Sequence, residues 1–444
     1  MINLFDSYSE KSRDLHISLL MSGINNTTVV VYDDGFLPND VISPLEMVLK
    51  EHHCLLEGTP RYFNEIEMPQ TWEIIANYKS GIIYDKGIPR GKINYVYKDN
   101  SRIVKTVDWY GRISTPIITD HYNQWGWKFA TTSYDENGNP ALITYLTRSG
   151  KIVVEKNYQT DVITHYTPDG RCQLFRNEVE FVNYCLGMSN LELDEIIFNT
   201  LSISFFVVLK QTTKAKHHLF WQEKIMHDIP GNMKFALKNR NDIDILVQNH
   251  SSYNKIKGII PDSKLKKVRY LGYIFPFKRK NKGRKNILIY TATDKLININ
   301  AIIQHLPDFT FNIAASTKMS IRLLALDNLP NVNLFPSSKK EQLEDLLASC
   351  DFYLDINDGR ELNNILKKAF INNMLIISYE GIQHNRRFTI DDCIFDRHDV
   401  DSIVRLLNEV SGSRSSLEML LQRQWNKADA DKIKQYRQFL YPSI

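Results

Sequence analysis

The feature that most constrains the fold is the stretch from residue 68 to 176. In it, apolar side chains stop recurring at helical spacing and alternate in short runs instead. Glycines at positions 111, 126, 138 and 150 lie in turn signals between these runs, 15, 12 and 12 residues apart. Turns at such intervals are typical of consecutive β-hairpins. The stretch is therefore predicted to form an extended antiparallel β-meander.

Both flanks of this stretch have an α/β pattern. Ile2–Phe5 is predicted as a strand, Ser9–Met21 as a helix capped by Ser9, and Thr27–Tyr32 as a strand. The α/β pattern resumes after Phe175, and a second Rossmann-like unit begins at Asn286–Tyr290. The first Rossmann-like domain is predicted to comprise residues 1–67 and 177–277, and the inserted β-sheet domain residues 68–176. The second Rossmann-like domain is predicted at 286–425, followed by a C-terminal helix at 426–444 that packs back on the first domain.

The second domain contains a predicted βαβ unit. The apolar run Phe352–Leu354 ends a strand, a short loop follows at Asn357–Arg360, and Met374–Ser378 is a buried strand. Between them, apolar residues recur three and four apart, as on one face of a helix: Leu362, Ile365, Leu366, Ala369 and Phe370. Ligands of open α/β sheets bind at the carboxyl ends of the strands. A donor phosphate or sugar is therefore expected at this loop and helix start.

Composition excludes several classes of protein. The net charge of +4 is too small for a dedicated nucleic-acid binder. Five cysteines without a CxxC motif favour reduced thiols in the cytosol, and no leader segment is recognised at Met1–Asp6. The histidine pairs at 52–53 and 217–218 lack partners at metal-ligand spacing, so neither a metal nor a cofactor is predicted.

Two features leave alternatives open. The linker Phe277–Lys285 carries six basic residues, and is either a solvated interdomain hinge or an electrostatic attachment to an anionic membrane surface or an acidic partner. Aromatic residues of the meander either pack against a neighbouring layer or form a platform that binds an acceptor polypeptide or sugar. The acceptor-binding candidates are Trp109, Tyr110, Trp125, Trp127, Tyr134 and Tyr145.

Three stretches carry a resemblance to a known family: GFLPNDVISP (Gly35–Pro44), TPRYFNEIEMPQTWEI (Thr59–Ile74), and LDINDGRELNNILKKAF (Leu354–Phe370) with the later HNRRF (His384–Phe388). They resemble the non-catalytic stabilising subunit of the accessory-Sec O-GlcNAc transferase, along nearly the whole chain. The resemblance implies a GT-B-like α/β fold, with two Rossmann-like domains and the extended antiparallel β-meander inserted in the first.

The resemblance also implies partners. A catalytic O-GlcNAc transferase subunit transfers N-acetylglucosamine to the serines and threonines of a serine-rich adhesin before its export. This chain would bind that subunit, in a hetero-oligomer that the family suggests is a heterotetramer, and would help to bind the adhesin polypeptide. The expected location is the cytoplasm, with peripheral association at the inner face of the membrane as a further option.

Retaining enzymes of the GT-B family carry three features that this chain lacks. Glu361 fits the first of two glutamates, but Ala369 stands eight positions later; no arginine follows Ile289–Tyr290; and no glycine follows the first strand. Cations stabilise the leaving diphosphate, so their loss weakens catalysis. Asp358, Arg360, Glu361 and Ala369 are therefore interpreted as a degenerate donor site, without catalytic residues. The alternative is an active, retaining UDP-sugar-dependent enzyme with an atypical donor site.

Overall fold

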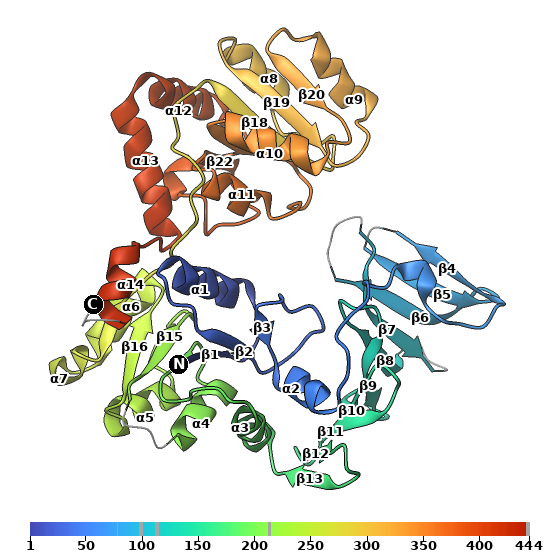
Figure 1. Cartoon of the computed structure of the whole chain (residues 1–444). Helices are drawn as coiled ribbons and strands as arrows, with labels where there is room; N and C mark the ends of the chain where they lie inside the picture. Colours follow the sequence, from blue (N-terminus) through green and yellow to red (C-terminus); the bar gives the residue numbers. More distant parts are fainter. Residues whose placement is uncertain (78, 97–100, 112–114, 212–214, 441–444) are drawn as a thin grey trace. The chain divides into compact units, whose positions relative to one another are not determined.

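The structure is a computed structural model that describes residues 1–444 except 78, 97–100, 112–114, 212–214 and 441–444. The last four residues of the predicted C-terminal segment thus lie outside the described part. The chain forms two compact units, Met1–Gly272 with Lys434–Ile444, and Tyr273–Ile433 (Figure 1). Each unit is described separately below.

The first unit contains a seven-stranded parallel sheet. The strands, in spatial order, are β17 (Val268–Tyr270), β16 (Ile243–Val247), β15 (His217–Trp221), β14 (Ile196–Phe198), β1 (Ile2–Phe5), β2 (Thr27–Val30) and β3 (Val41–Ile42). If these seven strands are numbered 1 to 7 along the chain, their spatial order read from β3 begins 3-2-1-4-5-6. This is the order of doubly wound nucleotide-binding sheets. The Rossmann-like prediction for this part is confirmed.

Helices cover both faces of this sheet. They are α1 (Glu10–Met21), α2 (Pro44–Glu51), α3 (Glu178–Met188), α4 (Ile203–Lys210), α5 (Gly231–Asn239), α6 (His250–Ile259), α7 (Asp262–Leu265) and α14 (Ile433–Leu440). The Ser9 side chain accepts a hydrogen bond from the backbone of Ser12, as predicted for the cap of α1. One large cluster packs β1, β2 and β14–β17 against α3–α6.

The predicted β-meander forms a ten-stranded antiparallel sheet between β3 and β14, in strict chain order. Its strands are β4 (Trp72–Ala76), β5 (Ser80–Asp85), β6 (Ile88–Tyr95), β7 (Val104–Tyr110), β8 (Pro116–Tyr122), β9 (Lys128–Tyr134), β10 (Pro140–Leu146), β11 (Ile152–Asn157), β12 (Ile163–Tyr166) and β13 (Cys172–Phe175). The turn glycines at 126, 138 and 150 have φ near +80°, which explains the glycine spacing that predicted the sheet.

The second unit is a six-stranded parallel sheet of order β20-β19-β18-β21-β22-β23, again the doubly wound order. Its strands are β18 (Asn286–Thr291), β19 (Thr310–Ala315), β20 (Val332–Phe335), β21 (Phe352–Asp355), β22 (Leu375–Tyr379) and β23 (Ile394–Phe395). Its helices are α8 (Ile299–His305), α9 (Ile321–Leu324), α10 (Lys340–Ser349), α11 (Ile365–Ile371), α12 (Val400–Gly412) and α13 (Arg414–Lys427). The GT-B-like fold class is confirmed.

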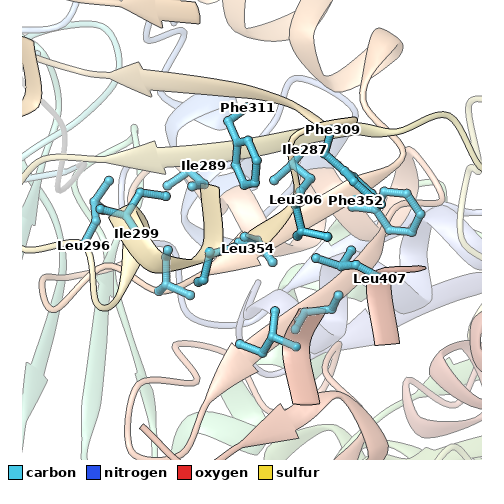
Figure 2. Packing of buried hydrophobic residues seen from close by; sticks show 14 of the residues in the cluster. Ile287, Ile289, Leu296, Ile299, Leu306, Phe309, Phe311, Phe352, Leu354 and Leu407 are labelled. Carbon is cyan, nitrogen blue, oxygen red and sulfur yellow. The ribbon is translucent and has the colours of Figure 1, made fainter. Parts of the chain in front are cut away.

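Two apolar clusters lie on opposite faces of this second sheet. One joins alternate strand residues such as Ile287, Ile289 and Leu354 to α8, α12 and α13 (Figure 2). The other joins the intervening residues, such as Leu288 and Tyr353, to α10 and α11. The strands are apolar on both faces because both faces are covered.

The basic linker is attached to the second unit rather than fully solvated. Asp351 is fully buried and accepts hydrogen bonds from Arg279 and from Arg284, whose Nε lies 3.0 Å from Oδ2. Asn281 donates to the backbone carbonyls of Asp351 and Asn373, at 2.8 and 2.9 Å. The hinge interpretation is therefore wrong for this part of the linker, because two of its six basic residues, both partly exposed, pair with the buried carboxylate of Asp351.

Candidate functional site

The candidate donor site lies where the chain order of the second sheet reverses, between the ends of β18 and β21. Here backbone bonds join the two loops directly: Asp358 N donates to Lys295 O at 2.9 Å, and Ile297 N donates to Ile356 O at 3.0 Å. A Cβ added to Gly359 would lie 3.1 Å from Thr293 Cγ2. The two loops are thus packed against each other at the edge of the sheet where ligands of open α/β sheets bind.

The helix at this site begins later than predicted. α11 starts at Ile365, because Asn363 and Asn364 both have φ near +50° and break the helical path. Leu362 still packs in the same cluster, although it precedes the helix. Neither Glu361 nor Asp358 lies in the first turn. The apolar periodicity predicted the buried residues correctly but not the helix boundary.

The four positions that were predicted to form a degenerate donor site differ in burial and in contacts. Ala369 is fully buried among apolar side chains, in a space that a carboxylate could not occupy without losing its hydration. The Glu361 carboxylate accepts a hydrogen bond from Leu366 N at 3.1 Å, so it binds the start of α11. Arg360 is half-buried and Asp358 is exposed. Glu361 therefore already has a role in holding the fold.

His384 holds this loop from the opposite side, a role that the sequence analysis did not assign. Its Nδ1 lies 2.6 Å from Asp355 Oδ1, and its Nε2 lies 2.9 Å from Gly359 O. Both partners are acceptors, and only a protonated ring can donate to both of them at once. Although burial opposes the charge, the hydrogen bond to Asp355 raises the pKa of His384 above its usual value. The only signal in the sequence was its position in HNRRF.

This contact predicts a pH dependence of stability. The pKa of His384 is higher in the folded state, so its stabilisation is fully present below the unfolded value of about 6.5 and is lost as pH rises through the folded pKa. We expect His384→Gln to lower the melting temperature of the second unit at pH 6 more than at pH 9, in calorimetry. His398→Gln, at an exposed terminus of α12, is the control. An equal effect of His384→Gln at both pH values would contradict this contact.

The structure does not bring the six candidate acceptor-binding aromatics together. Tyr145 and Trp127 pack in the cluster between the meander and helices α2 and α3, and burial raises the pKa of Tyr145 well above its usual range. Trp109 donates to Asp120 at 2.9 Å, and Tyr134 shares a hydrogen bond with Thr119 at 3.0 Å. Five of the six are half-buried, namely Trp109, Tyr110, Trp125, Tyr134 and Tyr145, and Trp127 is buried.

The two halves of the meander are covered on opposite faces. In the first half, Ile93 and its partner Val107 pack beneath Ile66 of the preceding segment. Cross-strand pairing connects Val107 to Asp120 of β8, then to Thr131 of β9 and Thr144 of β10, so these residues lie on the same face of the sheet. The buried residue of β10 is the neighbouring Ile143, which points to the other face and packs on α2 and α3. Each half therefore leaves a different face open.

The first two marker stretches attach the meander to the rest of the first unit. Gly35 O accepts a hydrogen bond from Gln124 N at 2.8 Å, and a Cβ on Gly35 would lie 2.8 Å from Tyr122 O. In the second stretch, Arg61 Nε donates to Gly126 O at 2.9 Å. A Cβ on Gly126 would lie 2.1 Å from Thr59 O, so glycine is required there. Both stretches thus serve packing rather than catalysis.

Asp33 fixes the first of these stretches. Its carboxylate accepts hydrogen bonds from Gly35 N at 2.8 Å and from Ser43 Oγ at 2.6 Å, and Ser43 caps α2. Burial raises the pKa of Asp33 to about 6. Beside it lies a cavity of about 410 Å³ whose lining includes Leu37, Glu46, Lys50 and Trp125. Trp125 thus borders this cavity, and Tyr145 lines a smaller one of about 30 Å³.

Among the described residues, no cluster of three or more histidine, cysteine, aspartate or glutamate side chains is arranged to bind a metal ion. Within the same residues, every helix is too short or too polar to cross a bilayer.

Comparison with family models matches four parts of the chain. They are described as the GtfB N-terminal domain (residues 2–47), the GtfB middle domain (72–176), the GtfB third domain (178–259) and the GftB/GlyA-F C-terminal domain (287–424). The middle-domain match coincides with the ten-stranded sheet.

Full-length relatives carry one shared name. The chain is 36% identical to the UDP-N-acetylglucosamine–peptide N-acetylglucosaminyltransferase stabilizing protein GtfB of Streptococcus agalactiae, covering 99% of both chains. It is 33% identical to the protein of that name from Streptococcus gordonii, over 99% of this chain and 98% of the relative. A chain in the crystal structure of a GtfA/B complex bound to UDP and GlcNAc superimposes with a TM-score of 0.90 at 32% identity, covering 100% and 99% of the two chains.

Proposed function

Because this chain belongs to the family of GtfB stabilising proteins, we propose that it is the non-catalytic, stabilising and acceptor-binding subunit of a protein O-GlcNAc transferase. The relatives are named for stabilising a transferase, and the matched crystal structure is that of a two-component complex. The proposed partner is a catalytic GtfA-type subunit. The proposed acceptor is a serine-rich adhesin polypeptide.

The packed loops at the end of β18 and β21 carry the non-catalytic part of this proposal. The bonds from Asp358 N and Ile297 N, and the packing of Gly359 against Thr293, hold the two loops together at the edge of the sheet where a donor would be expected. Arginine is also missing from the loop after β18, where a developing diphosphate charge would need cations. The site keeps the scaffold of a donor site without its catalytic groups.

This predicts that UDP-GlcNAc does not bind to the second unit. Isothermal calorimetry of the purified chain should show no heat of binding at millimolar UDP-GlcNAc, and the catalytic partner is the positive control. Glu361→Gln keeps an oxygen acceptor for Leu366 N, so it should leave the activity of the complex within about twofold. Saturable binding of UDP-GlcNAc, lost in Glu361→Gln, would favour an active enzyme with an atypical donor site.

The acceptor-binding role is proposed for the surface-reaching aromatics of the meander, in particular Trp125. Its half-buried ring stacks on Trp127 at a centroid distance of 6.4 Å, so Trp127 supports it from the core. A rigid aromatic ring at a cavity mouth with Glu46 and Lys50 suits an extended polar polypeptide.

Trp125→Ala should therefore weaken binding of a fluorescent Ser/Thr-rich peptide by about 2- to 10-fold, the effect of losing one aromatic contact. Fluorescence anisotropy measures this change. Tyr158→Ala removes an exposed aromatic that lines none of the cavities described here, and should leave affinity unchanged. Equal affinities for the two variants would remove Trp125 from the proposed acceptor surface.

The cytoplasm is the proposed location, since the acceptor is to be modified before export. Exposed lysines of the linker, Lys278, Lys280 and Lys282, are available for weak attraction to an anionic surface. Such an attraction would be screened by salt, with a Debye length of about 10 Å at 0.1 M. Sedimentation with phosphatidylserine vesicles at low and high salt tests it.

A further inference from the structure

The free edge of the meander at β13 has the features of a strand-addition site. β13 is the last strand of the sheet and pairs only with β12 among the described strands. Three of its four residues are exposed, and Leu174 is 67% exposed. It contains neither proline nor lysine, the residues that commonly protect an edge strand from pairing with another chain.

The hydrogen-bond register identifies which backbone groups of β13 are free. Asn157 N donates to Val162 O at 2.9 Å, so residues 162 and 164 point their backbone groups toward β11, and 163 and 165 point theirs toward β13. Residues 173 and 175 pair with 165 and 163. The alternation of antiparallel ladders therefore turns the N–H and C=O of Cys172 and Leu174 outward.

A cavity of about 560 Å³ borders this strand. Its lining comprises Glu51 of α2, Tyr184 of α3, Cys172 and Gln173 of β13, and Thr167, Pro168, Asp169 and Arg171 of the hairpin turn. Carboxylate, amide, guanidinium and phenol groups converge there, so the cavity offers both donors and acceptors to a small polar side chain.

Two polar groups at the base of this region are unsatisfied. Glu51 Oε2 is buried and accepts no hydrogen bond from any described residue. Behind it, His165 is fully buried, its Nε2 lies 3.3 Å from Glu51 Oε2, and neither ring nitrogen is hydrogen-bonded within the described chain. Buried polar groups normally have partners, so the Glu51 carboxylate, which lines the cavity and makes no hydrogen bond through Oε2 within the described chain, points to a ligand that supplies a donor.

We propose that an extended, hydroxyl-rich polypeptide adds to the outward edge of β13, with a serine or threonine side chain entering the cavity beside Glu51. Backbone bonds to Cys172 and Leu174 would give affinity without sequence dependence, and the cavity would select small hydroxylated side chains. This inference rests on the proposed acceptor-binding function and locates one contact of that acceptor.

The size of the edge favours a polypeptide acceptor over a second copy of the chain. Only two residues of β13 present outward backbone groups. Pairing of two copies at this edge would therefore bury far less surface than the roughly 1,200–2,000 Å² that a stable protein–protein interface buries. A low-complexity polypeptide, by contrast, can engage several short sites at once and gain affinity by multivalency.

The test removes one outward N–H. Leu174→Pro deletes the donor at the free edge but none of the bonds to β12, since proline is tolerated at outward positions of edge strands. Leu174→Ala keeps the N–H and controls for the lost side chain. At the opposite edge of the sheet, Asn77 N donates to Ser80 O, so the N–H of Ala76 also points outward and Ala76→Pro is the matched proline control.

Binding of a fluorescent Ser/Thr-rich peptide to the full-length chain is the readout. Leu174→Pro should weaken it at least fivefold relative to Leu174→Ala, Ala76→Pro should not, and Glu51→Ala should weaken it as well. The amides of Cys172 and Leu174 should gain hydrogen-exchange protection on peptide binding. Normal peptide binding by Leu174→Pro would overturn strand addition at β13, and so would a variant that changes only in oligomeric state. Neither result would contradict the proposal that the chain binds the acceptor. Failure of the unmodified chain to bind the peptide would overturn both.

Discussion

Replacing Asp351 by asparagine is expected to produce the largest loss of stability in the second unit. The Asp351 carboxylate is fully buried and is the shared acceptor for Arg279, for Arg284 and for the backbone N–H groups of residues 282 and 284. Removing one partner of a buried ion pair typically costs about 3–5 kcal/mol, because the remaining charges lose their compensation. Asp351→Asn should therefore lower the melting temperature of this unit by roughly 6–20 °C.

The control uses a second aspartate that pairs with the same linker. Asp308 is 77% exposed and lies 3.2 Å from Lys285, so Asp308→Asn should change stability by less than about 1 kcal/mol. Differential scanning calorimetry of the full chain measures both variants. Similar melting temperatures for the two variants would show that the linker is not fixed by Asp351.

The contact of Asp351 with Arg279 and Arg284 should also make the stability of this unit depend on pH in the acid range. Although burial opposes its charge, the hydrogen bonds from Arg284 and Arg279 lower the pKa of Asp351 below its usual value. A lowered folded pKa gives stability that is present above the unfolded value of about 3.9 and is lost as pH falls through the folded value. The stability of Asp351→Asn should accordingly depend less on pH below 4 than that of the unmodified chain.

Tyr436→Ala is expected to have the second large effect, this time in the first unit. Tyr436 of α14 is fully buried, stacks on Phe220 at a centroid distance of 6.0 Å, and donates to Gly272 O at 2.7 Å. Gln248 Nε2 in turn donates to its hydroxyl at 3.2 Å. Truncation of a buried aromatic ring typically costs about 3–5 kcal/mol.

Loss of this ring should also free α14 from the first unit, which hydrogen exchange would detect as reduced protection of residues 433–440. Tyr436→Phe keeps the ring but leaves Gln248 and Gly272 O without that partner, and should cost about 1–3 kcal/mol. Gln438→Ala, at an exposed position of the same helix, should be within about 0.5 kcal/mol of the unmodified chain. Full protection of α14 in Tyr436→Ala would mean that other contacts hold it.

Local signals in the sequence predicted the fold well where turns and periodicity determine it. Glycines with positive φ determine the hairpins of the meander, and apolar strands covered on both faces identify the two parallel sheets. The start of α11 was predicted too early, because Asn363 and Asn364 continue a helical pattern in the sequence but adopt left-handed conformations. Asparagine tolerates that conformation, so the pattern alone could not locate the break.

The candidate sites were harder to predict, for a physical reason. Alternation within a strand shows that its two faces differ, but not which face another layer covers. The covered face changes between the two halves of the meander, so Trp127 is in the core and Tyr145 packs against it, while Trp125 reaches a cavity. The missing carboxylate at Ala369 was visible in the sequence, whereas the packing of Gly359 against Thr293 required the structure.

The central proposal is that this chain assists a transferase without performing the transfer itself. The most direct measurement is transfer of radiolabelled GlcNAc from UDP-GlcNAc to a Ser/Thr-rich polypeptide, by the chain alone, by a co-expressed GtfA-type partner alone, and by the two together. If the chain only assists the transferase, we expect no transfer by the chain alone, and more transfer by the pair than by the partner alone. Transfer by the isolated chain, abolished by Glu361→Gln, would contradict it.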